Sequence, residues 1–84
     1  MARAFVFPYN GCRVDGGDVV MAMPVTFVAD NGDTFGPTID VRVPLTATPQ
    51  QIRAAILAEV SVQGALVNCV ITQNETILMG YEKG

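Results

Sequence analysis

The stretch VADNGDT at residues 28–34 constrains the fold more than any other part of the sequence. It separates two long stretches, 18–29 and 33–45, in which apolar and polar residues alternate with the period of a β-strand. The pair Asn31-Gly32 is a strong turn signal, so the two stretches predict an antiparallel hairpin. Two loop lengths fit this signal, and each one sets a different strand register.

A two-residue loop would place Asp30 opposite Asp33, where the two carboxylates repel each other. It would also put Met23 on the same face as Asp40. A three-residue loop, Asp30-Asn31-Gly32, with a left-handed residue at Gly32, avoids both problems and gives the usual bulged hairpin. It pairs odd-numbered residues with odd-numbered residues: Phe27 with Phe35, Val25 with Pro37, Met23 with Ile39 and Met21 with Val41. Because the apolar side chains then share one face, we predict the three-residue loop.

The aspartates of this loop also suggest an alternative, a bound cation. A calcium loop supplies oxygen ligands at alternate positions and closes with a distal bidentate carboxylate. Asp30 and Asp33 are followed by TFGP at residues 34–37, which offers no closing acid. We therefore interpret the segment as a turn and expect no metal site.

The stretch TATPQQIRAAILAEV contains the signals of a helix start. Thr48 can cap the helix, Pro49 fits its first position, and Gln51 completes a capping box. An apolar stripe follows at helical spacing, made of Ile52, Ala55, Ile56, Leu57 and Val60. We expect the helix to end between Ser61 and Gly64, with Gly64 as the left-handed stop.

Shorter strands are predicted on both sides of these elements. Residues 4–9, AFVFPY, alternate and contain Pro8, which cannot donate a backbone hydrogen bond, so they predict a strand at a sheet edge. Residues 12–14 lie between two turn signals and predict only a connector or a strand fragment. After the helix, ALVNCVIT and ETILMGY predict two strands joined at Gln73-Asn74-Glu75, with Cys69 as a small core residue.

Residues 1–84 are thus expected to form a single α+β domain. Its mainly antiparallel β-sheet has one α-helix packed across one face, in the order strand, hairpin, helix, two strands. The succession around DVRVPLTATPQQIRAAIL resembles a ubiquitin-like β-grasp over roughly residues 18–81. Members of that family that are conjugated or carry sulfur end in a di-glycine tail. This chain ends in Glu82-Lys83-Gly84, so the resemblance implies the fold and not the carrier function.

Composition excludes several classes of function. The net charge is −3 and the five basic residues are scattered, so we expect no nucleic-acid partner. No apolar run approaches the about 20 residues that span a bilayer, so no membrane partner is expected. The chain has no His and a single Ser, Ser61, which removes the usual catalytic sets. We predict no enzyme activity, no cofactor, and two free thiols at Cys12 and Cys69.

Only 15% of the residues are charged and 50% are hydrophobic, which leaves few charges to cover a small fold. Exposed apolar surface usually marks the place where a partner binds. Short, charge-poor chains rich in Val, Ala, Thr and Gly resemble small structural proteins of tailed-phage virions, such as capsid decoration or tail proteins. The resemblance implies other copies of the chain or other virion proteins as partners, an oligomer or larger assembly, and a virion location after synthesis in the host cytoplasm.

Two alternatives remain open, both of them cytoplasmic proteins that bind a single host protein. One is a small phage-encoded inhibitor, and the other is a β-grasp adaptor. For any of these functions, the expected interface is the set of apolar residues that the helix does not cover. It comprises Phe5, Phe7, Tyr9, Val20, Ala22 and Val28, and for the first three the alternative of joining the core stays open.

Overall fold

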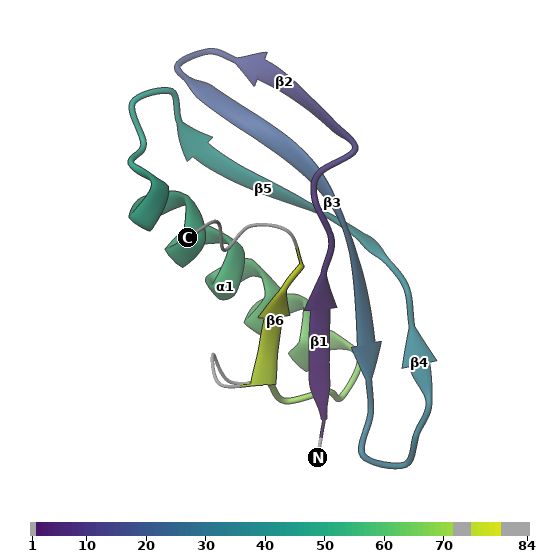
Figure 1. The fold of residues 1–84 in the computed structure, drawn as a ribbon. Helices are drawn as coiled ribbons and strands as arrows, with labels where there is room; N and C mark the ends of the chain where they lie inside the picture. Colours follow the sequence, from purple (N-terminus) through teal and green to yellow (C-terminus); the bar gives the residue numbers. More distant parts are fainter. Residues whose placement is uncertain (1, 72–74, 80–84) are drawn as a thin grey trace.

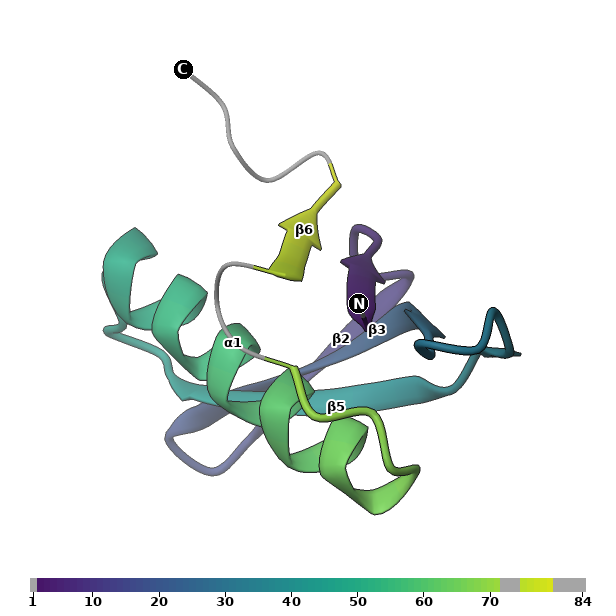
Figure 2. The ribbon, with the colours of Figure 1, turned by 90° about the horizontal axis from the view of Figure 1, so that it is seen from below.

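The computed structural model describes residues 2–71 and 75–79, which form a mixed, mainly antiparallel sheet with one helix packed across it. The predicted α+β class is therefore confirmed. Figure 1 shows the order of the elements, and Figure 2 shows the helix on one side of the sheet. The elements are β1 (Arg3–Val6), β2 (Gly11–Asp15), β3 (Asp18–Val28), β4 (Thr34–Phe35), β5 (Thr38–Pro44), α1 (Pro49–Leu66) and β6 (Thr76–Leu78). The expected connector residues 73–74 and the tail 82–84 lie outside the described residues.

The hairpin of β3 with β4 and β5 has the predicted register. Met21 pairs with Val41, Met23 with Ile39 and Phe27 with Phe35. The loop is closed by hydrogen bonds from the Ala29 N–H to the Asp33 carbonyl and from the Gly32 N–H to the Ala29 carbonyl. Gly32 has φ +92°, a left-handed conformation that favours glycine. The three-residue loop is thus confirmed, together with the single apolar face that it creates.

The other edge of β3 pairs with two consecutive strands. β1 pairs with the C-terminal half of β3 and β2 with its N-terminal half, both antiparallel. Between them, residues 7–10 lie opposite only Met23 and Pro24, so the ladder is interrupted there. Pro24 lies in the middle of β3, and its carbonyl accepts a hydrogen bond from the Phe7 N–H at this interruption. The backbone nitrogen of Pro24 points to the same side, so the N–H that proline lacks is not needed for a ladder hydrogen bond.

For the N-terminal region, the predicted edge strand is wrong, whereas the strand alternative for residues 12–14 is confirmed. β1 is not an edge strand, because it lies between β3 and β6. Pro8 follows the end of β1 and falls in the interruption, so it does not affect pairing. Residues 12–14 are not a mere connector, since they lie in strand β2, which forms a tight hairpin with β3 through Gly16-Gly17.

The helix begins as predicted and ends later than predicted. Thr48 accepts from the Gln51 N–H, and the Gln51 side chain accepts from the Thr48 N–H, which is a complete capping box. The helix runs past Gly64 to Leu66, and the left-handed residue is Asn68, with φ 60°. Hydrogen bonds from the Asn68 N–H to Ala65 and from the Cys69 N–H to Gly64 complete the helix stop.

Gly64 has a role that differs from the expected one. It is buried in the last turn of α1, and a Cβ atom there would lie 2.5 Å from the Cys69 carbonyl oxygen. The chain after the helix therefore folds back over a position where only a hydrogen atom fits. Phe27 and Ile71 side chains also approach this point, at 3.3 and 3.4 Å.

The predicted strand at residues 65–72 is wrong. Ala65 and Leu66 belong to the helix, and residues 69–71 join no strand. Cys69 and Ile71 are nevertheless buried, because the extended chain crosses the core beside α1 without pairing. The second predicted strand is present as β6, which pairs with β1 in parallel.

The core lies between α1 and the helix-facing side of the sheet. Its large, fully buried side chains come from β1, β3, β5, α1 and the segment that follows α1. They include Val6, Met23, Val25, Phe27, Val41, Ile56, Val60 and Cys69. Phe35 lies on this face, as its pairing with Phe27 requires, and is 38% exposed. It lies at the distal end of the hairpin, where the side chains of β4 are exposed.

We predict that Gly64→Ala destabilises the protein by about 1–3 kcal/mol, because the added methyl group overlaps a backbone carbonyl that cannot move without disturbing the helix stop. This cost exceeds the roughly 1 kcal/mol that alanine gains over glycine inside a helix. Urea unfolding measures the difference. Ser61→Ala, an exposed change in the same helix, is the control and should not destabilise. A Gly64→Ala variant more stable than the wild type would contradict the close approach.

Candidate interaction surface

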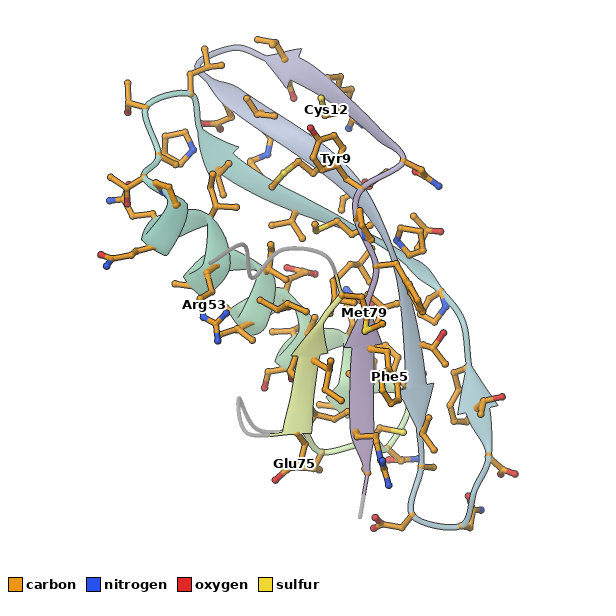
Figure 3. The ribbon with its side chains drawn as sticks, in the orientation of Figure 1. Phe5, Tyr9, Cys12, Arg53, Glu75 and Met79 are labelled. Atoms are coloured by element: carbon orange, nitrogen blue, oxygen red, sulfur yellow. The ribbon has the colours of Figure 1, made fainter. Side chains whose placement is uncertain are left out.

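An apolar surface lies where β1 and β6 run side by side, on the sheet face opposite α1. Phe5 and Ile77 are register partners in this parallel pair, so their side chains point to the same side. The Met79 N–H donates to the Val6 carbonyl at 2.7 Å and extends the ladder by one step. We call Phe5, Phe7, Ile77 and Met79 the outer apolar surface. Figure 3 shows Phe5 and Met79 near each other at this place.

The residues of the outer apolar surface remain accessible in the single chain. Phe7, Ile77 and Met79 are 38%, 42% and 41% exposed, and Phe5 is half-buried. Alternation along β1 directs Ala4 and Val6 into the core, where both are fully buried, and leaves the aromatic residues outside. The same alternation on β6 buries Leu78 and exposes its neighbours.

The predicted interface residues are only partly brought together. Phe5 and Phe7 belong to the outer apolar surface, whereas Tyr9, 49% exposed, lies farther along the chain toward β2 (Figure 3). Ala22 and Val28 are half-buried on the outer face of β3. Ile77 and Met79 were not predicted as interface residues, although the sequence does place both on one face of their strand. Only the pairing of β6 with β1 shows which face that is.

Val20 differs from the expectation, since it is only 3% exposed within the single chain. The register places it on the outer face, with Arg13 and Arg42 as its neighbours on the two adjacent strands. Long arginine stems cover apolar neighbours while their charged ends stay in water. Val20 is therefore already covered by its own chain and offers little surface to a partner.

Arg42 is held across this end of the outer face by two carboxylates. Its Nη2 donates to Asp15 Oδ2 at 2.7 Å, and its Nη1 donates to Asp18 Oδ2 at 3.1 Å. The hydrogen bond from Arg42, and then the positive charge of Arg42, lower the pKa of Asp15 from its usual value of 3.8. The same two hydrogen bonds raise the pKa of Arg42. The three groups link β2, β3 and β5 at the solvent-exposed end of the sheet.

A shallow hollow of ≈ 410 Å³ lies between the 30–32 loop and the end of α1. Asp30 of the loop and Asp33 just after it border the hollow, and so do Phe35 and Asn68. Within the loop, the Asn31 amide donates to Asp33 Oδ2 at 3.1 Å, and its carbonyl oxygen accepts from the Asp33 N–H at 3.0 Å. These are hydrogen bonds of a polar turn, in agreement with the sequence interpretation.

Residues 2–71 and 75–79 also contain cysteines and carboxylates outside the outer apolar surface. No three acidic, cysteine or histidine side chains in this part of the chain are grouped so that they could hold a metal ion. Cys12 is exposed and Cys69 is buried, both as free thiols, as predicted. Within the same residues, no helix has the length and apolar character needed to cross a bilayer. The exposed side chains of the paired strands β1 and β6 make the outer apolar surface a candidate functional site.

We predict that the Asp15–Arg42 ion pair makes stability depend on pH. The pKa of Asp15 in the folded protein lies below its unfolded value of 3.8. The contribution of Asp15 to the free energy of unfolding is therefore fully present above pH 3.8 and is lost as the pH falls through the folded pKa. Arg42→Met keeps the apolar stem and removes the charge. Urea unfolding from pH 5 to pH 2.5 should therefore show a shallower loss of stability in Arg42→Met than in the wild type. The same pH dependence in both proteins would contradict the assignment.

No protein-family model, curated protein or solved structure matches this chain.

Proposed function

We propose that this protein is a non-enzymatic structural protein that acts through protein–protein contacts, as one of many copies in a larger assembly. The assembly context that we propose is a tailed-phage virion, with the chain as a capsid decoration or tail component. The partners are other copies of the chain or other proteins of the particle. The observation that carries the proposal is the cluster of exposed apolar side chains on the β1–β6 pair.

The outer apolar surface supports this proposal because its side chains come from strands at opposite ends of the sequence. Phe5 and Ile77 are adjacent through the sheet ladder and not through a mobile loop, so their spacing is fixed before a partner binds. A surface that is already ordered loses little conformational entropy on association. Aromatic residues and Met are also the types enriched at the centres of protein interfaces.

The charges of the outer face support the same proposal. Arg42, Asp15 and Asp18 satisfy one another at the end of the sheet distant from Phe5 and Ile77. The apolar residues at the β1–β6 end can therefore be buried without burying this ion-pair cluster, whose desolvation would be costly. The absence of His and of a second Ser in the sequence supports binding over catalysis.

We predict that Ile77→Asp weakens association by at least about tenfold, or about 1.4 kcal/mol, because a carboxylate would be buried in an apolar contact. Size-exclusion chromatography with light scattering measures the mass across a concentration series. Val62→Asp on α1 is the matched control, because Val62 is 56% exposed and lies away from the β1–β6 pair. Circular dichroism and urea unfolding verify that both variants remain folded.

The wild-type chain should form oligomers, and negative-stain microscopy should show rings or regular arrays of them. A wild-type chain that stays monomeric at all concentrations would overturn the self-assembly proposal and favour a protein that binds a single host partner. Equal weakening by Ile77→Asp and Val62→Asp would show that the outer apolar surface is not the contact.

A further inference from the structure

Among residues 2–71 and 75–79, no strand pairs with the second edge of β2, so β2 presents an open strand edge. It is the terminal strand of its sheet path, paired on one side with β3, and all five of its residues are exposed. The direction of its backbone groups follows from one hydrogen bond, in which the Leu45 N–H donates to the Gly17 carbonyl at 3.0 Å. Gly17 and Leu45 are the neighbours of Asp18 and Pro44, which are register partners in β3 and β5. Asp18 and Pro44 are therefore a non-hydrogen-bonded pair, and the N–H and C=O groups of Asp18 point away from β5 and toward β2. Asp15, the register partner of Asp18, faces β3 in turn.

Alternation along β2 then directs the N–H and C=O groups of Cys12 and Val14 away from the sheet. Val14 is also 66% exposed. A free strand edge of this kind is a template for pairing with another strand. β2 contains no proline, whereas the β5 edge carries Pro44 at the end of the strand and Pro37 just before its start. The β2 edge is therefore the better template of the two.

We propose that β2 pairs antiparallel with β2 of a second copy across a two-fold axis, with Val14 opposite Val14. Only the N–H and C=O groups of Cys12 and Val14 are available to a second strand. The symmetric registers that use them place Val14 opposite Val14, Cys12 opposite Cys12, or Cys12 opposite Val14 of the other copy. The charges distinguish among these registers. Cys12 opposite Val14 would put Arg13 opposite Arg13, which is repulsive. Val14 opposite Val14 puts Arg13 of each copy opposite Asp15 of the other, which gives two ion pairs on the outer face.

This contact differs from the outer apolar surface and does not depend on the proposed function. β2 lies at one end of the sheet and β6 at the other end (Figure 1). A two-fold contact alone closes into a dimer, whereas a chain with a second, separate contact can build larger assemblies. The β2 pairing would therefore supply a dimeric unit, and the outer apolar surface would join such units to one another or to other proteins.

A disulfide introduced at residue 14 tests the register. In an antiparallel hydrogen-bonded pair, opposing Cα atoms lie about 5.5 Å apart, which is within the range for a disulfide. In the same register, two Cys12 residues are offset by about four strand positions, or about 13 Å. Under mild oxidation, the double variant Cys12→Ser with Val14→Cys should form a covalent dimer on a non-reducing gel. The wild type, with Cys12 alone, should not.

Cys12→Ser alone is the control for the buried thiol of Cys69 and should remain monomeric on the gel. Cross-linking through Cys12 in the wild type would overturn the proposed register. The absence of cross-linking in the double variant would overturn the β2 contact itself.

A charge reversal at Arg13 tests the proposed ion pairs. Arg13→Glu places a glutamate opposite Asp15 of the partner and should raise the dimer dissociation constant at least about tenfold by sedimentation velocity. Arg3→Glu makes the same charge change at an exposed residue of β1 and should leave the dimer intact. An unchanged dimer in Arg13→Glu would overturn the pairing. Cross-linking through residue 14 should persist in an Ile77→Asp background, so failure of the β2 contact and failure of the outer apolar surface are distinguishable.

Discussion

The structure depends on the register of the β3 hairpin, which the loop at Asp30-Asn31-Gly32 sets. β3 is eleven residues long and pairs along both of its edges, so every other strand except β6 is positioned by it directly. A shift of one residue in the loop would turn Met21, Met23, Val25 and Phe27 away from the helix. Because Gly32 tolerates a left-handed backbone, the loop keeps these side chains under α1. The outer face of the sheet is thereby left for other contacts.

The two faces of the sheet consequently have different characters. The helix-facing side holds the buried core, which includes the alternating residues of β3 and β5. The outer side is divided between the Arg42 cluster at one end and Phe5, Phe7, Ile77 and Met79 at the other. The members of the first group pair with one another, and the second group stays partly exposed in the part of the chain that the structure describes. Together with the open edge of β2, this division offers the two separate contact regions that we propose.

Sequence reasoning succeeded where a local pattern decides the structure. The loop register followed from alternation in the two long strands, and the helix start followed from Thr48 and Gln51. Local patterns gave wrong predictions where contacts between residues distant in the sequence determine the structure. Residues 67–71 alternate like a strand because Cys69 and Ile71 face the core, yet this segment forms no ladder. Gly64 is a residue type typical of a helix stop, but the close approach of the Cys69 carbonyl is a better explanation for a glycine at this position.

The candidate surface was predictable only in part for the same reason. Phe5 and Phe7 could be identified by their alternation, but Ile77 joins them through a parallel pairing between the first and last strands of the described chain. Val20 is an apolar residue on the outer face, as expected of an interface residue, and only the strand register shows that two arginines flank it. Long-range pairing of short strands leaves little local signal, because neither strand can stand alone.

Hydrogen–deuterium exchange of the wild-type protein at low and high concentration tests the central claim most directly. If the outer face and the open edge bind other copies, the amides of Cys12 and Val14 and those of β6 should gain protection as the concentration rises. The amides of the core strand β3 should not change, because they are already paired within one chain. Identical exchange at both concentrations throughout the molecule would contradict the account.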